Sequence, residues 1–108
     1  MTTLWTLRLS AQADLDIMEI LAWTTEYFGA SQAETYAETI TSALEHLTQG
    51  PTVLGVKNRE DIAPGIRSLH VARAGRKGRH MIIFRTAPPF VDVLRILHDS
   101  MDMAIHIR

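Results

Sequence analysis

The stretch that decides the fold is "RHMIIFRT" (79–86) and, after Ala-Pro-Pro, "FVDVLRILH" (90–98). Both runs are rich in Val, Ile, Leu and Phe, and the prolines between them indicate a hairpin connection. The second run carries apolar side chains on both faces, with Val91, Val93 and Leu97 on one and Phe90, Leu94 and Ile96 on the other. This pattern is typical of a central strand that is covered on each side. We therefore predict an antiparallel strand pair at the heart of a sheet.

The segments before this pair extend the sheet. "IRSLHVA" (66–72) predicts a third strand, which "RAGRKG" (73–78) connects to the pair as a second hairpin. Residues 51–65 contain two prolines, two glycines and a charged cluster, and they predict a surface loop. "TLWTLRLS" (3–10) predicts a short N-terminal strand.

Helical patterns fill the region between that strand and the loop. Ser10 is a plausible N-cap for a helix over residues 11–28, which Gly29 ends. Its apolar stripe consists of Ala13, Ile17, Ile20, Leu21, Thr24 and Phe28. A second helix within residues 30–51 stops at Gly50-Pro51, and its stripe consists of Ala33, Tyr36, Ala37, Ile40, Leu44 and Leu47. The glycine-centred turn predicts an antiparallel helical hairpin.

The order of these elements predicts an α+β fold in a single domain over residues 1–108. The N-terminal strand and a three-stranded antiparallel meander form one small sheet, and a short C-terminal tail or helix follows. Helices that precede a mostly antiparallel sheet are expected to cover one of its faces.

Composition limits the classes of function. The chain has no cysteine, which excludes disulfides, thiolate metal sites and a cysteine nucleophile and is compatible with a reducing cytoplasm. We find no membrane span and no signal peptide. The net charge is −1, but residues 1–50 carry seven acids and one base (−6), whereas residues 51–108 carry ten bases and five acids (+5). The basic half suits an acidic partner or a phosphate backbone.

Some polar residues have the types and spacing that chemistry requires. His98, Asp102 and His106 would share a helix face and could bind zinc or manganese, unless His98 ends a strand. A ribonuclease needs an arginine or lysine beside proton-transfer groups. The candidates are Arg67, His70, Arg79, His80, Arg85, Arg95 and His98. These residues lack a fixed spacing, and strand arginines also pair with Asp92, Asp99 or Asp102.

Other residues favour binding to a macromolecule. "RAGRKGR" (73–79) holds four of the eleven Lys/Arg, and it is either a phosphate contact or a solvated turn. Trp23 and Tyr27 lie at the edge of the first helical stripe, where they are either core residues or an exposed anchor for a partner.

The whole pattern resembles the ParE branch of the RelE/ParE toxin superfamily. The resemblance runs through "LSAQADLDIMEILAWTTEYFG", "QAETYAETITSALEHLTQGP", "GIRSLHV", "GRHMIIFR" and, most specifically, "VLRILHDSMD". Trp23 and Phe84 stand where relatives often have tyrosine. The resemblance implies a helical hairpin on a small antiparallel sheet and a toxin of a type II toxin–antitoxin module.

The resemblance also implies partners. The antitoxin would be a ParD-like protein with a ribbon–helix–helix part and an acidic C-terminal segment that wraps the toxin, and the complex would bind operator DNA through the antitoxin. ParE toxins act on DNA gyrase, whereas RelE-branch relatives cut ribosome-bound mRNA. Residues 78–108 contain no lysine and the last tyrosine is Tyr36, so the Lys/Tyr part of a RelE-like C-terminal set is absent. A RelE-like ribosome-dependent endoribonuclease, or a non-toxic relative that only binds its antitoxin, remain the alternatives.

We therefore expect a binding surface, with no catalytic residue, metal, cofactor or membrane contact. The expected antitoxin- or target-binding residues are Ile20, Trp23, Tyr27, Arg67, Arg73, Arg79, His80, Arg85, Arg95, His98, Met101 and Asp102. Arg95 is expected to pair with a partner carboxylate, so that Arg95→Ala weakens binding without unfolding the chain.

Overall fold

A computed structural model describes residues 4–101 of the chain, and within them five strands form one mixed sheet. In sheet order the strands are β1 (Thr6–Leu9), β5 (Phe90–His98), β4 (His80–Ala87), β3 (Arg67–His70) and β2 (Lys57–Asn58). Strands β3, β4 and β5 form the predicted antiparallel meander, and β1 pairs with β5 in parallel. The prediction of a loop throughout residues 51–65 is wrong at β2, because this short strand pairs with the edge of β3.

The predicted helical hairpin is confirmed as α1 (Ala11–Phe28) and α2 (Ala30–Leu47). The Ser10 side chain accepts a hydrogen bond from the N–H of Ala13 at 2.9 Å and donates one to the carbonyl of Leu94 at 2.7 Å. The same residue thus caps α1 and anchors its start to β5. Gly29 joins the helices with a φ of 91°, which glycine adopts at little cost.

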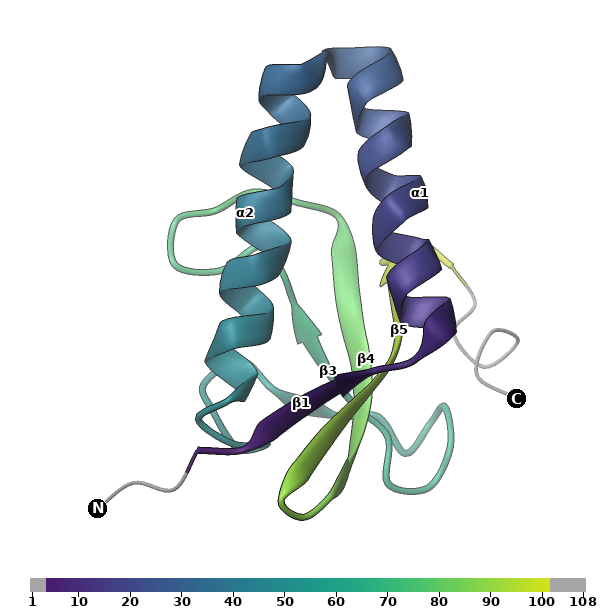
Figure 1. The fold of residues 1–108 in the computed structure, drawn as a ribbon. Helices are drawn as coiled ribbons and strands as arrows, with labels where there is room; N and C mark the ends of the chain where they lie inside the picture. The colour runs from purple at the N-terminus through teal and green to yellow at the C-terminus, as the bar shows by residue number, and fades with distance from the viewer. Residues whose placement is uncertain (1–3, 102–108) are drawn as a thin grey trace.

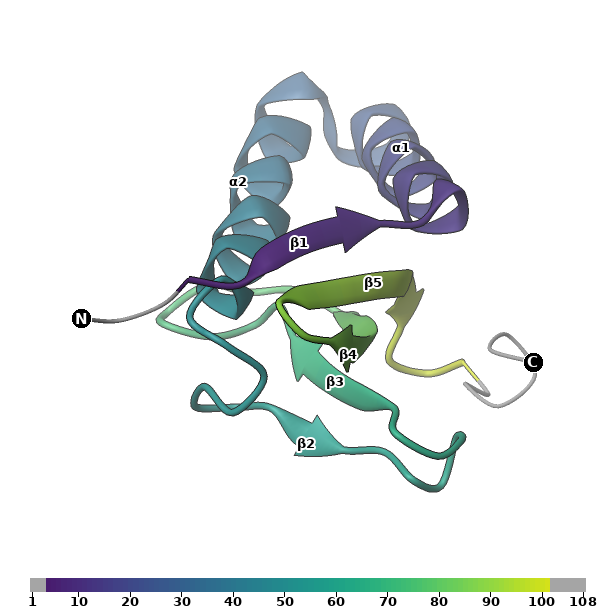
Figure 2. The same cartoon turned by 60° about the horizontal axis from the view of Figure 1, so that its bottom comes forward.

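Both helices lie on one face of the sheet, as Figure 2 shows. The core between them includes Ile40 and Leu47 of α2, Phe84 of β4 and Val91 and Val93 of β5, each with at most 1% of its surface exposed. The opposite face of the sheet carries a smaller apolar cluster around Ile66, Ile83 and Leu97. Part of the 59–66 segment covers this cluster with Ile62 and Ala63.

A β-bulge in β5 changes the predicted faces of that strand. Ile83 is opposite Arg95 and Phe84 is opposite Val93, so Leu94 has no partner residue on β4. The strict alternation predicted for β5 is therefore wrong beyond Leu94. Ile96 joins the helix-side core, and Leu97 lies in the cluster on the other face.

The outer half of the helical hairpin projects beyond the sheet (Figure 1). Phe28 was expected on the buried stripe of α1, but it is 63% exposed because no strand reaches the end of the hairpin. None of the helices in residues 4–101 is long and apolar enough to cross a membrane.

Candidate functional site

A large open cleft lies between the projecting half of the helical hairpin and the end of the sheet. Its volume is about 1090 Å³. One side consists of helix residues, and the other consists of the loop that connects β3 to β4 and of the paired ends of β4 and β5. The cleft is lined by Glu19, Ile20, Trp23, Thr24, Phe28, Gln32, Thr35, Tyr36, Thr39, Gly75, Arg76, Lys77, Gly78, Arg79, His80, His98, Ser100 and Met101.

The helix side of the cleft presents Trp23 and Phe28, and Tyr27 extends this aromatic surface outside the cleft. The Trp23 ring lies 4.9 Å from the Tyr27 ring and 5.6 Å from the Phe28 ring, measured between centroids. These three side chains are between 55% and 63% exposed, so most of their apolar area faces water. An unpaired aromatic cluster of this kind is typical of a binding surface.

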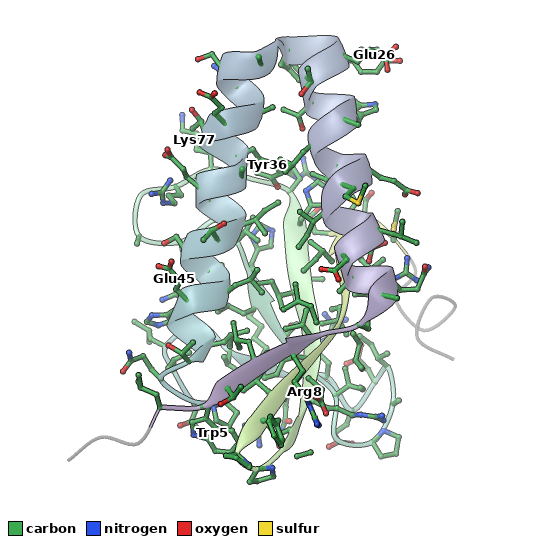
Figure 3. All side chains as sticks on the ribbon, viewed as in Figure 1. Trp5, Arg8, Glu26, Tyr36, Glu45 and Lys77 are labelled. Atoms are coloured by element: carbon green, nitrogen blue, oxygen red, sulfur yellow. The ribbon has the colours of Figure 1, made fainter. Side chains whose placement is uncertain are left out.

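The floor of the cleft is polar and centres on Tyr36 and His80. The Tyr36 hydroxyl lies 2.6 Å from His80 Nδ1 and accepts a hydrogen bond from the Arg79 backbone N–H at 3.2 Å. Figure 3 shows Tyr36 pointing inward from α2, whereas Glu26 and Glu45 point to the outside of the hairpin. Gly78 allows this approach, because a Cβ atom there would lie 2.7 Å from Tyr36 Cε1 and from Val71 Cγ2.

Both floor groups are uncharged at neutral pH, and burial reinforces this state in each. Burial, aided by the nearby His98, lowers the pKa of His80 to about 4. The pKa of the Tyr36 hydroxyl is raised, again chiefly by burial. The neutral hydroxyl therefore donates to His80 Nδ1, and we assign the proton of this imidazole to Nε2.

His98 lies beside His80 at the rim of the cleft. The two rings meet edge to face, with centroids 5.3 Å apart and an interplanar angle of 83°. His98 Nδ1 accepts the Ser100 backbone N–H at 3.2 Å and lies 2.7 Å from Ser100 Oγ. Nδ1 is thus the acceptor nitrogen of this ring as well, which places its proton on Nε2.

Asp99 links the end of β5 to the end of β3 and to the residue before β4. Its carboxylate accepts hydrogen bonds from Arg79 at 3.1–3.2 Å and from His70 Nε2 at 3.0 Å. Hydrogen bonds from Arg79 first and His70 second lower the pKa of Asp99 to about 2. Arg79 is therefore paired within the protein, with 69% of its side chain exposed.

Arg95 differs from its sequence prediction, because the structure commits its guanidinium to a carboxylate of the same chain. Arg95 donates to the two carboxylate oxygens of Asp16 at 2.8 and 2.9 Å, and the backbone N–H of Ile96 donates to Asp16 at 2.9 Å. Strand β1 pairs with β5 only as far as Val93, so Asp16 of α1 satisfies the strand edge beyond that point. The Arg95 side chain is 18% exposed and that of Asp16 is 8% exposed.

The structure brings half of the predicted binding residues together in the cleft. These are Ile20, Trp23, Arg79, His80, His98 and Met101. The other described ones do not line it: Tyr27 contacts Trp23, Arg67 donates to the Pro51 carbonyl, Arg73 donates to the Leu54 carbonyl, Arg85 is exposed on β4, and Arg95 pairs with Asp16.

The helical spacing considered for a metal triad does not begin at His98. His98 ends a strand, and Asp102 and His106 lie outside the described residues.

Sequence reasoning missed two residues that shape the site. Tyr36 was predicted to lie on the core stripe of α2. The helical periodicity of that stripe does not indicate that the Tyr36 hydroxyl reaches His80, which is 44 residues away. Asp99 was considered only as a partner of arginines. Its position next to His98 was the available signal that it belongs to the same strand end.

Comparisons with known proteins agree with this architecture. The family described as "ParE toxin of type II toxin-antitoxin system, parDE" matches residues 7–103. Toxin ParE1 of Mycobacterium tuberculosis (strain ATCC 25618 / H37Rv) is 31% identical over 104 residues, which cover 95% of this chain and 96% of that protein.

Solved structures share the fold. The chromosomal ParDE toxin–antitoxin system from P. aeruginosa superposes with a TM-score of 0.71 at 21% identity, over 89% of this chain and 97% of that one. The YoeB dimer from Staphylococcus aureus superposes with a TM-score of 0.53 at 11% identity, over 84% of this chain and 92% of that one.

Proposed function

Because the chain belongs to the ParE toxin family of type II toxin–antitoxin systems, we propose that it blocks replication by binding DNA gyrase in the cytoplasm. We propose further that a ParD-like antitoxin neutralises it by placing an acidic amphipathic segment in the cleft, and that the complex binds operator DNA through the antitoxin. The single observation that carries this proposal is the cleft itself, which combines an aromatic wall with a basic loop.

The cleft has the properties that an acidic amphipathic segment requires. Trp23 and Phe28 offer exposed aromatic surface to its apolar side chains. Arg76 and Lys77 border the opposite side, where Figure 3 shows Lys77 on the loop beside α2. Such a segment orders on binding, and burial of aromatic anchors supplies the free energy that ordering costs.

The chemistry of the floor favours binding over catalysis. A general base at neutral pH needs a pKa near 7, whereas the pKa of His80 is about 4 and its Nδ1 is already hydrogen-bonded to Tyr36. Asp99 holds Arg79 in an ion pair, which leaves less of its charge to stabilise a phosphorane.

One observation favours the second candidate, a RelE-like ribosome-dependent mRNA endoribonuclease. Tyr36, His80, His98 and Arg79 share one cleft, and these residue types transfer protons or bind phosphate in nucleases. Under this alternative an mRNA strand would occupy the cleft in place of a protein segment.

A pair of assays tests the proposal. Purified toxin is added to gyrase with supercoiled and relaxed DNA, and separately to ribosomes translating a defined mRNA. We expect trapped double-strand breaks or lost supercoiling in the first assay, reversed by the antitoxin encoded beside the toxin gene. Site-specific mRNA cleavage that disappears in His80→Gln, with gyrase unaffected, would select the endoribonuclease.

A further inference from the structure

The side of α1 that faces away from the sheet carries a mostly apolar stripe, the outer stripe. Its members follow one another at steps of four, three, four and three positions, and all of them are exposed. They are Ala11, Leu15, Met18, Ala22 and Thr25. The buried residues of α1, Ala13, Asp16 and Thr24, lie on the opposite side of the helix. No member of the outer stripe lines the cleft.

The composition of the outer stripe suits contact with another helix. Apolar residues at alternating steps of three and four form the seam along which two helices pack. Leu15 is 46% exposed and Met18 is 65% exposed, and the small side chains of Ala11 and Ala22 allow a partner to approach the backbone. From residue 11 to residue 25 the stripe runs for roughly 21 Å, which matches about four turns of a partner helix.

Acidic residues border the outer stripe on both sides. By helical spacing Asp14 lies on one side, and Glu19 and Glu26 lie on the other, at the positions that meet a partner across a seam. Figure 3 shows Glu26 pointing away from the hairpin. Residues 11–47, which comprise both helices, contain no lysine or arginine. A partner of the outer stripe therefore meets carboxylates on each flank.

These charges decide which kind of partner fits. A second copy of the chain would bring carboxylates next to carboxylates in both the parallel and the antiparallel arrangement, and like charges at such positions oppose pairing. The acidic segment proposed for the cleft is disfavoured on the stripe for the same reason. A helix with Lys or Arg on both sides of an apolar stripe complements the acids and the apolar residues together.

We propose that the outer stripe of α1 is a second docking surface, which binds a basic amphipathic helix of a protein partner. Leu15 and Met18 are its anchors, and the flanking acids select for positive charge. The stripe meets the cleft only at Glu19, which borders both, so the chain is able to hold this partner and an acidic segment at the same time. This inference goes beyond the proposed function, because it holds whether or not the cleft binds an antitoxin.

Designed helical peptides test the proposal. The probe, the Lys peptide, has about 21 residues, with Leu at a, Ala at d and Lys at e and g of each heptad, and its control carries Glu in place of Lys. Binding to the wild-type chain is measured by fluorescence anisotropy at about 0.15 M salt. We expect one Lys peptide to bind per chain, and the Glu peptide to bind at least about tenfold more weakly.

Matched variants distinguish a docking surface from general attraction between opposite charges. The double variant Leu15→Gln, Met18→Gln keeps every charge and replaces exposed residues with another good helix former, so it should fold and yet bind the Lys peptide about tenfold more weakly. Met18→Gln alone should lose part of that affinity. Leu54→Gln is the control, because it removes a leucine that is 88% exposed on a loop, and it should bind as wild type. Circular dichroism and urea unfolding verify the fold of each variant.

Chemical-shift mapping locates the bound peptide. In the ¹⁵N-labelled wild-type chain, the Lys peptide should shift the amide signals of α1 and leave those of Gly75 and Gly78, which line the cleft, in place. Three results would each overturn the proposal: a double variant that binds the Lys peptide as tightly as the wild type does, a Glu peptide that binds as tightly as the Lys peptide, or shifts centred on the cleft. A wild-type chain that sediments as a dimer, when the double variant is a monomer, assigns the stripe to a second copy and also overturns it.

An antitoxin peptide keeps this inference apart from the proposed function. It is a synthetic copy of the acidic C-terminal segment of the antitoxin encoded beside the toxin gene, and it should bind the double variant as tightly as the wild type. If it binds neither chain, the antitoxin pairing is wrong and the outer stripe stands or falls by the Lys peptide alone. If it binds the wild type but not the double variant, the antitoxin occupies the outer stripe and the proposal is overturned.

Discussion

Replacing Arg95 with methionine should destabilise the fold by about 3 kcal/mol, because it leaves the Asp16 carboxylate buried without its cation. The Asp16 oxygens accept two bonds from Arg95, at 2.8 and 2.9 Å, and one from the Ile96 N–H at 2.9 Å. Only 8% of the Asp16 side chain is exposed, so water cannot replace the guanidinium effectively. Removing one partner of a buried pair costs about 3–5 kcal/mol, and we take the lower end because the Ile96 N–H remains.

Urea unfolding followed by circular dichroism measures this cost. Arg95→Met, Asp16→Asn and the double variant complete a thermodynamic cycle. The asparagine can still accept the Ile96 N–H, and the double variant contains no unpaired charge. It should therefore be more stable than Arg95→Met, with a coupling energy of about 2 kcal/mol between the two sites. In thermal unfolding, Arg95→Met should lower the Tm by about 12 °C or more.

A small effect would refute this reasoning. If Arg95→Met unfolds within about 0.5 kcal/mol of the wild type with an unchanged m-value, the ion pair contributes nothing measurable. Arg95 would then be available to a partner carboxylate, as its sequence pattern alone predicts.

Further predictions concern the cleft. Trp23→Ala should weaken binding of the antitoxin peptide by about 2 kcal/mol in a titration, whereas Leu54→Ala, which removes an 88% exposed side chain away from the cleft, should leave the affinity unchanged. Gly78→Ala should cost about 1–3 kcal/mol in urea unfolding, because its Cβ would lie 2.8 Å from the Tyr36 hydroxyl, and it should also weaken peptide binding. The unfolded chain protonates His80 near pH 6.5 and the folded chain near pH 4, so stability should fall as the pH drops between these values, by about 1–2 kcal/mol after allowance for solvent screening. His80→Gln should flatten that part of the urea stability profile against pH, and a profile unchanged by the substitution would contradict the assignment.

The sequence signals for the fold were strong where they act over a few neighbouring residues. Helix α1 begins after Ser10 and ends before Gly29 as predicted, because an N-cap side chain and a glycine after a helix act over three or four residues. Local sequence patterns did not reveal the β-bulge at Leu94. The bulge arises from register against β4, and a period-two pattern in β5 alone cannot reveal that one residue lacks a partner.

In the candidate site too, some features were predictable from local sequence and others depended on tertiary contacts. His80 and His98 were both candidates from the sequence, and the pairing of β4 with β5 places them opposite each other. Tyr36 was assigned to the core because helical periodicity reports which face a residue occupies. Whether its hydroxyl packs against apolar atoms or forms a hydrogen bond with a histidine depends on the loop between β3 and β4, where Gly78 lies against the tyrosine ring.

The sequence by itself determined the helical hairpin, the meander, the charge division and the resemblance to a toxin family. These features depend on periodicity, turn chemistry and composition, all of which act along the chain. Only the tertiary structure decided that Arg95 is paired within the fold, that half of the hairpin projects beyond the sheet, and that Tyr36, His80 and His98 share one cleft. Pairing and burial depend on contacts between residues 44 to 79 positions apart, and no local pattern encodes which distant partner a side chain meets.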